Sequence, residues 1–183
     1  YPRSLPIRFK RLVFVLIDAL RGDFLNQPGG FTRTQHLISS GKGVLFESIA
    51  AAPTVTLPRI RAIVSGSPPT FSDVVYNVLT GSVTAEENIA SSAALLKRTV
   101  FYGDETWLRI VPNTLFLRAE STSSFWVRDT VEVDSNVTRG IDYELSHCEQ
   151  WDSMFVHYLG VDHIGHIQGP NGSLMKPKFV ELD

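Results

Sequence analysis

The segment from Val161 to Pro170 pairs two side chains that bind metals. It reads Val-Asp-His-Ile-Gly-His-Ile-Gln-Gly-Pro, so Asp162 and His166 stand four residues apart. On a helix this spacing places both side chains on one face, where a carboxylate and an imidazole supply two ligands for Zn²⁺. His163 points elsewhere in that geometry and is expected to support the site or lie on the surface. An Asp-x-x-x-His pair also occurs without a metal, so the residues alone leave both interpretations open.

Asp18 is a second candidate ligand. It directly follows the apolar run Leu12–Ile17, which is typical of a strand buried on both faces of a parallel sheet. An isolated aspartate in this place is more often a helix cap or loop residue. The functional alternative is a metal ligand held rigidly at a strand end.

Two hydroxyls precede a predicted helix in the segment Ala52–Arg59. Pro58 suits the first turn of that helix, and Thr56 stands just before it. Thr56 can cap the helix, or it can be a nucleophile at a helix N-terminus that favours phosphate. A threonine hydroxyl is inert at neutral pH unless a base or a metal activates it, and a metal held by Asp18 would do so. Arg59 is near enough to contact a phosphate, although such arginines are more often solvated.

Four further acidic or imidazole side chains are expected to have structural roles. Asp104, in the segment Phe101–Trp107, is favoured as the cap of the next helix over a catalytic residue. His157 lies within an apolar strand and is expected in the core or behind a site. His36 and His147 are expected to be ordinary helix residues.

The chain alternates strand-like and helix-like segments. This alternation predicts an α/β fold with a mostly parallel sheet and helices on both faces. Function then lies at the carboxyl ends of the strands, where the acidic residues of this chain suit metal ions. No P-loop or Gly-x-Gly-x-x-Gly turn is present. The predicted strands are 11–17, 44–50, 98–102 and 153–159, and the predicted helices are 34–40, 58–65, 86–97 and 138–150.

Composition narrows the classes of function. The 183 residues carry 17 Lys+Arg against 19 Asp+Glu, a net charge of −2, which disfavours a nucleic-acid binder with a basic face. The longest clean apolar run is far shorter than the roughly 20 residues that span a bilayer. The only cysteine, Cys148, cannot form an internal disulfide. Asn136 and Asn171 begin Asn-x-Ser/Thr sequences that would accept N-glycans in the secretory pathway.

Four motifs occur together in the order of a known family. They are Phe14–Phe24, Pro53–Arg59, Phe101–Trp107 and His157–Pro170. Together they resemble the luminal catalytic domain of the glycosylphosphatidylinositol (GPI) ethanolamine phosphate transferases, within the alkaline phosphatase superfamily. Within that family the resemblance is to the branch expected to modify the second mannose of the GPI anchor. It implies an alkaline-phosphatase-like fold, with residues 1–10 as a lead-in and 11–183 as the N-terminal portion of the domain.

The resemblance also implies a two-zinc mechanism. Asp18 and Thr56 would belong to one zinc ion, and Asp162 and His166 to the other. Thr56 would be the nucleophile, with Thr54 the less favoured alternative. It would take phosphoethanolamine from phosphatidylethanolamine and pass it to a mannose hydroxyl of the GPI precursor. Arg59, Asp104 and Trp107 become candidates for the substrate pocket.

The family implies a location and partners as well. The location would be the endoplasmic reticulum membrane, with the catalytic domain in the lumen and membrane segments outside this sequence. A small membrane-protein subunit is an expected partner, and nucleic acid is not.

The chain departs from the superfamily pattern in one respect. The superfamily completes its two sites with a later Asp-His pair and a further His, whereas no histidine follows His166 here. We therefore expect a fragment of a longer protein that alone binds zinc weakly and has little activity. The alternatives are a zinc phosphodiesterase or phosphatase that uses water as acceptor, and a catalytically incomplete binding module.

Overall fold

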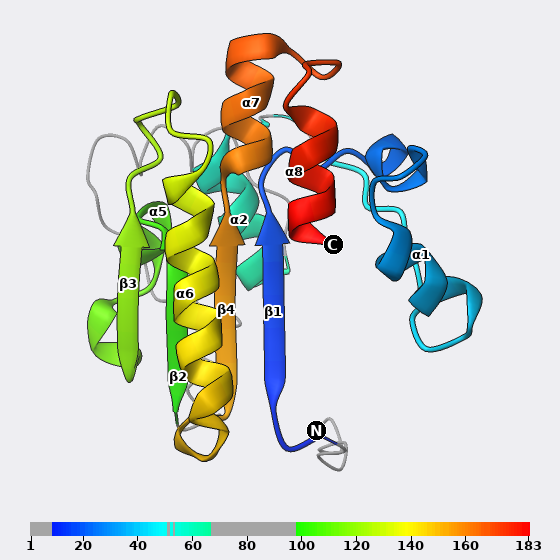
Figure 1. Cartoon of the computed structure of the whole chain (residues 1–183). Coiled ribbons are helices and arrows are strands. Elements are labelled where there is room, and N and C mark those ends of the chain that lie inside the picture. The colour runs from blue at the N-terminus through cyan, green and yellow to red at the C-terminus, as the bar shows by residue number, and fades with distance from the viewer. Residues whose placement is uncertain (1–8, 51, 53, 67–97) are drawn as a thin grey trace.

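A four-stranded parallel sheet forms the centre of the computed structural model, which describes residues 9–50, 52, 54–66 and 98–183. Its strands lie in the order β1-β4-β2-β3 (Figure 1). All three pairings are parallel, as the predicted α/β fold requires. The strands are β1 (Leu12–Ile17), β2 (Thr99–Asp104), β3 (Arg118–Thr122) and β4 (Ser153–Tyr158).

Helices cover both faces of the sheet, as predicted. Helix α6 (Glu132–Ser146) lies over one face, and α2 (Thr56–Ser65) and α5 (Thr106–Ile110) lie over the other (Figure 1). Phe101 and Phe155 point from the sheet into a core with α2 and α5. Alternate strand positions pack toward α6, so β2 and β4 are buried along their whole length.

Further helices lie near the carboxyl ends of the strands and beside them. Figure 1 shows α7 (Gly160–Gln168) and α8 (Met175–Leu182) beyond the ends of β4 and β1, with α1 (Thr32–Ser39) to the side of β1. A third apolar cluster joins α7 and α8 to the segment that follows β1. Short 3-10 turns span Gly22–Asn26, Asn113–Leu115 and Cys148–Gln150. No helix in the described residues is both long and apolar enough to cross a bilayer.

The prediction that the first strand is buried on both faces is wrong. β1 forms as expected but lies at an edge of the sheet, and Val13 and Val15 are 47% and 51% exposed. Within the described residues, no further strand pairs with its outer edge. A continuous apolar run therefore identified the strand but not its place in the sheet.

The predicted strand at 44–50 is also wrong. This segment forms no strand and pairs with nothing among the described residues, and Phe46 and Ile49 are 83% and 91% exposed. Its apolar side chains gave the strand signal without a neighbouring strand to complete it. The predicted helix at 86–97 lies outside the described residues.

Two elements were misplaced or missed for local reasons. Helix α6 begins at Glu132, earlier than the predicted start at 138, because Asp129 accepts hydrogen bonds from the N–H groups of Val131 and Glu132. Strand β3 has the polar sequence Arg-Ala-Glu-Ser-Thr and no predicted counterpart. It is a sheet edge whose side chains remain partly exposed.

Candidate active site

Asp18 and Thr56 lie in contact at the carboxyl edge of the sheet. The backbone N–H of Asp18 continues the β1–β4 ladder by donating to Tyr158 O at 2.9 Å. The Thr56 hydroxyl donates to Asp18 Oδ2 at 3.1 Å. The structure thus brings together the two residues that the family resemblance assigned to one metal.

The backbone around Asp18 has a sharp turn. Ala19 has φ 55°, a left-handed conformation that is uncommon for a residue other than glycine. Its N–H donates to Asp18 Oδ1 at 2.9 Å, so each oxygen of the carboxylate has a partner. Strained backbone of this kind persists where the surroundings enforce it. The turn fixes the direction in which the carboxylate points.

Thr56 is not the cap of its helix. It is the first residue of α2, the capping position is Val55, and among the described residues no side-chain hydrogen bond caps this helix end. The Thr56 hydroxyl bonds to Asp18 instead. The capping alternative considered for Thr56 is therefore wrong, and the hydroxyl lies at a helix N-terminus as a nucleophile for phosphate would.

A cavity of about 630 Å³ opens beside this pair. It is bounded by the end of β1, residues 48–50 and 54, and helix α2. Asp18, Thr54, Thr56, Arg59 and His157 contribute to its wall. Its volume is in the range of sites that bind small molecules.

His157, Asp104 and Trp107 form a buried group behind the cavity. His157 is 1% exposed, and its Nε2 lies 3.8 Å from Asp18 Oδ2. Trp107 Nε1–H donates to His157 Nδ1 at 3.1 Å. Asp104 Oδ1 accepts from the N–H and hydroxyl of Thr106, the first residue of α5, both at 2.9 Å, although the capping position of that helix is Glu105, which makes no side-chain capping bond to any described residue. Asp104 and Trp107 do not line the cavity, and they face it only through His157.

Burial and nearby charges shift the pKa values of Asp18 and His157. Burial raises the pKa of Asp18, opposed by His157 and reinforced by the carboxylate of Asp162. Burial lowers the pKa of His157, opposed by the carboxylates of Asp18 and then Asp104. The carboxylate of Asp162 is thus near enough to Asp18 to raise the pKa of Asp18.

Asp162 and His166 lie on one face of α7, as their spacing predicts. His166 Nε2 is 3.4 Å from Asp162 Oδ2, and the imidazole is largely exposed. The start of α7 is fixed by Asp134, which accepts from the N–H groups of Leu159 and Gly160, both at 3.0 Å. Sequence reasoning missed Asp134, because its contact depends on how α6 packs against α7.

His163 has a buried structural position. It is fully buried, with Nδ1 2.5 Å from the carbonyl oxygen of Asp129, which it reaches as a donor. The surface position considered for His163 is therefore wrong. The bond ties α7 to the loop before α6.

The residues present fit zinc only in part. Carboxylate oxygen, hydroxyl oxygen and imidazole nitrogen are suitable zinc donors. Each pair supplies two of them, and no group of three or more His, Cys, Asp or Glu side chains converges within the described residues. A closed four-ligand site needs donors from elsewhere.

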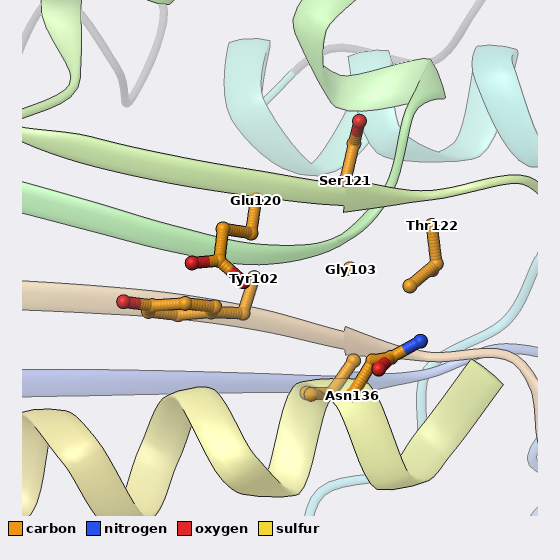
Figure 2. A pocket seen from close by; sticks show the side chains of 7 residues that line it. Tyr102, Gly103, Glu120, Ser121, Thr122 and Asn136 are labelled. Atoms are coloured by element: carbon orange, nitrogen blue, oxygen red, sulfur yellow. The ribbon is translucent and has the colours of Figure 1, made fainter. Parts of the chain in front are cut away.

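A smaller cavity of about 240 Å³ lies between the ends of β2 and β3 and helix α6. Figure 2 shows Thr122 of β3 and Asn136 of α6 on either side of Gly103.

Asn136 is exposed on α6, and Asn171 is exposed in the turn after α7. Both candidate glycosylation residues are thus at the surface.

The fold and this edge of the sheet fit the alkaline-phosphatase-like class that the motifs predict. Over 97% of its length the chain is 44% identical to GPI ethanolamine phosphate transferase 2, catalytic subunit, of Homo sapiens, covering 18% of that protein. It is 42% identical over 98% of its length to GPI ethanolamine phosphate transferase 2 of Schizosaccharomyces pombe, covering 25% of it. The Saccharomyces cerevisiae protein of that name is 40% identical over 96% of the chain, which covers 22% of it.

The chain is therefore a relative of the GPI ethanolamine phosphate transferases, as its motifs predict. It spans about a fifth to a quarter of the length of these relatives. No family model and no solved structure matches it.

Proposed function

We propose that this chain carries the nucleophile of a phosphoethanolamine transferase of GPI-anchor biosynthesis. The observation that carries the proposal is the 3.1 Å hydrogen bond from Thr56 to Asp18 on the wall of a cavity, with the carboxylate of Asp162 near enough to raise the pKa of Asp18. The names of the relatives support the same activity. The acceptor is a mannose of the GPI precursor, the second by resemblance to the relatives.

The proposed reaction has two displacements at phosphorus. First, Thr56 Oγ forms a bond to the phosphorus of phosphatidylethanolamine, and the bond to the diacylglycerol oxygen breaks. The Thr56 proton leaves toward Asp18, and diacylglycerol leaves with a proton from solvent. A mannose hydroxyl then attacks the same phosphorus and loses its proton to solvent. The bond between phosphorus and Thr56 Oγ breaks, and the proton held by Asp18 returns to Thr56 Oγ.

Asp18 with Thr56 and Asp162 with His166 would each hold part of a zinc site, completed by donors outside the described residues. Zinc bound there would lower the pKa of the attacking hydroxyl and stabilise the leaving oxygen. The residues of the chain orient the nucleophile: the strand end fixes Asp18, and the helix start fixes Thr56. We place the reaction at the luminal face of the endoplasmic reticulum membrane, where a small membrane-protein subunit is a partner.

The test is to trap the intermediate in the protein at its natural length. After incubation with phosphatidylethanolamine labelled in its headgroup, peptides are analysed by mass spectrometry. We expect phosphoethanolamine on Thr56 in the wild type, none in Thr56→Ala, and a wild-type amount in Thr54→Ala, whose hydroxyl lines the same cavity. A labelled Thr54 with an unlabelled Thr56 would overturn the assignment. Steady release of free phosphoethanolamine without a glycolipid acceptor would favour the hydrolase alternative.

A further inference from the structure

The buried imidazole of His157 lies near three polar side chains, those of Trp107, Asp104 and Asp18. Trp107 Nε1 is 3.1 Å from Nδ1, within hydrogen-bond distance, and an indole N–H can only donate. Asp104 Oδ2 is 3.9 Å from the same nitrogen, beyond hydrogen-bond distance. Nδ1 must therefore accept, and the neutral ring carries its proton on Nε2.

The protonated nitrogen faces the carboxylate of Asp18. Among the described residues Nε2 has no hydrogen-bond partner, and it lies 3.8 Å from Asp18 Oδ2. This gap is too long for a hydrogen bond and too short for a bridging water. Oδ2 is also the oxygen that accepts the Thr56 hydroxyl, whereas Oδ1 accepts from Ala19.

We propose that His157 is a positioning residue for Asp18, with its tautomer set by the indole N–H of Trp107. This inference rests on the proposed function, in which Asp18 orients Thr56. The Nε2–H dipole directs the negative charge of Asp18 onto the oxygen that receives the Thr56 proton. Supporting partners of this kind around metal and catalytic sites typically change affinity or activity by about 10- to 100-fold when removed.

The backbone of β2 also restricts the position of His157. Gly103 on β2 has φ +143°, and a Cβ there would lie 2.5 Å from His157 O and 2.8 Å from His157 Cβ. This close approach of β2 to β4 fixes the backbone and the Cβ from which the imidazole of His157 projects. The imidazole of His157 and the indole of Trp107 meet edge to face, with ring centroids 6.4 Å apart.

The kinetic test uses the natural-length protein and the rate at which Thr56 acquires phosphoethanolamine in a single turnover. His157→Leu should slow that rate about 10- to 100-fold with little change in the donor concentration at half-maximal rate. His157→Gln, whose amide N–H replaces Nε2–H, should recover the rate to within about threefold of wild type. Equal rates for the Leu and Gln variants would overturn the proposal.

Trp107→Phe keeps an aromatic ring in the core, removes the indole N–H and makes the side chain smaller. Its matched control is Trp151→Phe, because Trp151 is also buried and donates its indole N–H at 2.8 Å, but to Glu144 O on the other face of the sheet. We expect about a 10-fold slower rate for Trp107→Phe and an unchanged rate for Trp151→Phe. Equal slowing by both would overturn the role of Trp107.

A spectroscopic measurement tests the tautomer independently of activity. In protein labelled with ¹⁵N-histidine, the His157 signals are those lost in His157→Gln. Their chemical shifts should show a protonated Nε2 and an unprotonated Nδ1 in the wild type, and a mixture of tautomers in Trp107→Phe. A protonated Nδ1 in the wild type would overturn the proposal. Failure of the proposed function has a different signature: no adduct on Thr56, with the His157 signals and their response to Trp107→Phe as expected.

Discussion

The hydroxyl of Thr56 reaches Oδ2 of Asp18 at 3.1 Å although the two residues are 38 positions apart in the chain. One comes from the end of a strand and the other from the first residue of a helix, so each is fixed by its own backbone hydrogen bonds. A pair positioned by two regular elements varies less in geometry than one on flexible loops. Because the hydroxyl already donates to Asp18, the contact gives its proton a defined acceptor.

The charge of Asp18 is expected to be essential for transfer. Asp18→Asn keeps an oxygen that can accept from Thr56 but removes the negative charge, so we expect the rate of Thr56 modification to fall about 10²- to 10⁴-fold. The matched control is Asp23→Asn, since Asp23 is largely exposed and paired with Arg21 at the surface. Similar loss of transfer in both variants would contradict the assignment.

The sequence predicted most of what depends on local pattern. The strand before Asp18, the helix that starts near Thr56 and the shared face of Asp162 and His166 all follow from spacing and apolar runs. Contacts between distant segments were not accessible in this way. Asp134, which holds the start of α7, is an example, because its partners Leu159 and Gly160 are set by tertiary packing.

The predictions that were wrong also concern contacts between distant segments. Val13 and Val15 are β-branched residues, which are typical of a buried strand. The exposure of their side chains nevertheless depends on how many strands lie beside β1. The segment 44–50 has strand-forming residues, yet a strand needs a neighbour to accept its hydrogen bonds. Burial of Asp104 and Trp107 behind His157 likewise arises from the packing of α5 against the sheet.

Metal analysis of the natural-length protein tests the corner formed by Asp162 and His166. Removing one of two ligands that a chain gives a zinc ion weakens its binding strongly. We expect Asp162→Asn and His166→Gln each to lower the zinc content by about one ion per protein after dialysis. His36→Gln serves as control, because His36 is exposed on α1. Unchanged zinc content in both site variants would contradict the metal role of this pair.

Gly103→Ala should be more destabilising than a positive φ alone explains. The new Cβ would contact His157 O at 2.5 Å, so we expect a loss of about 2–3 kcal/mol in the free energy of unfolding. Gly41→Ala is the control for backbone strain: φ is +72°, but nothing lies within 4 Å of the added atom. It should cost about 1 kcal/mol. Equal losses, measured by denaturant unfolding, would show that the contact with His157 contributes nothing.

The buried ion pair between Glu144 and Arg118 should make stability depend on pH. Arg118 donates to both oxygens of the Glu144 carboxylate, at 2.7 and 2.6 Å, and Tyr102 OH donates to one of them at 2.7 Å. Burial raises the pKa of Glu144, but the hydrogen bonds from Arg118 and then Tyr102 outweigh it, so the pKa lies below its ordinary value of 4.5. The charged form is thus stabilised by folding.

A group whose pKa is lowered by folding contributes stability above its unfolded pKa and loses it as the pH falls through its folded pKa. Glu144→Gln should therefore cost about 2 kcal/mol at pH 7 and progressively less below about pH 4.5. The control is Glu132→Gln on the same helix, because Glu132 is exposed and lies 3.6 Å from an exposed Arg139. It should change stability by less than about 0.5 kcal/mol at either pH. Denaturant unfolding at pH 7 and pH 4 measures both differences, and a Glu144→Gln effect that stays constant with pH would contradict the lowered pKa.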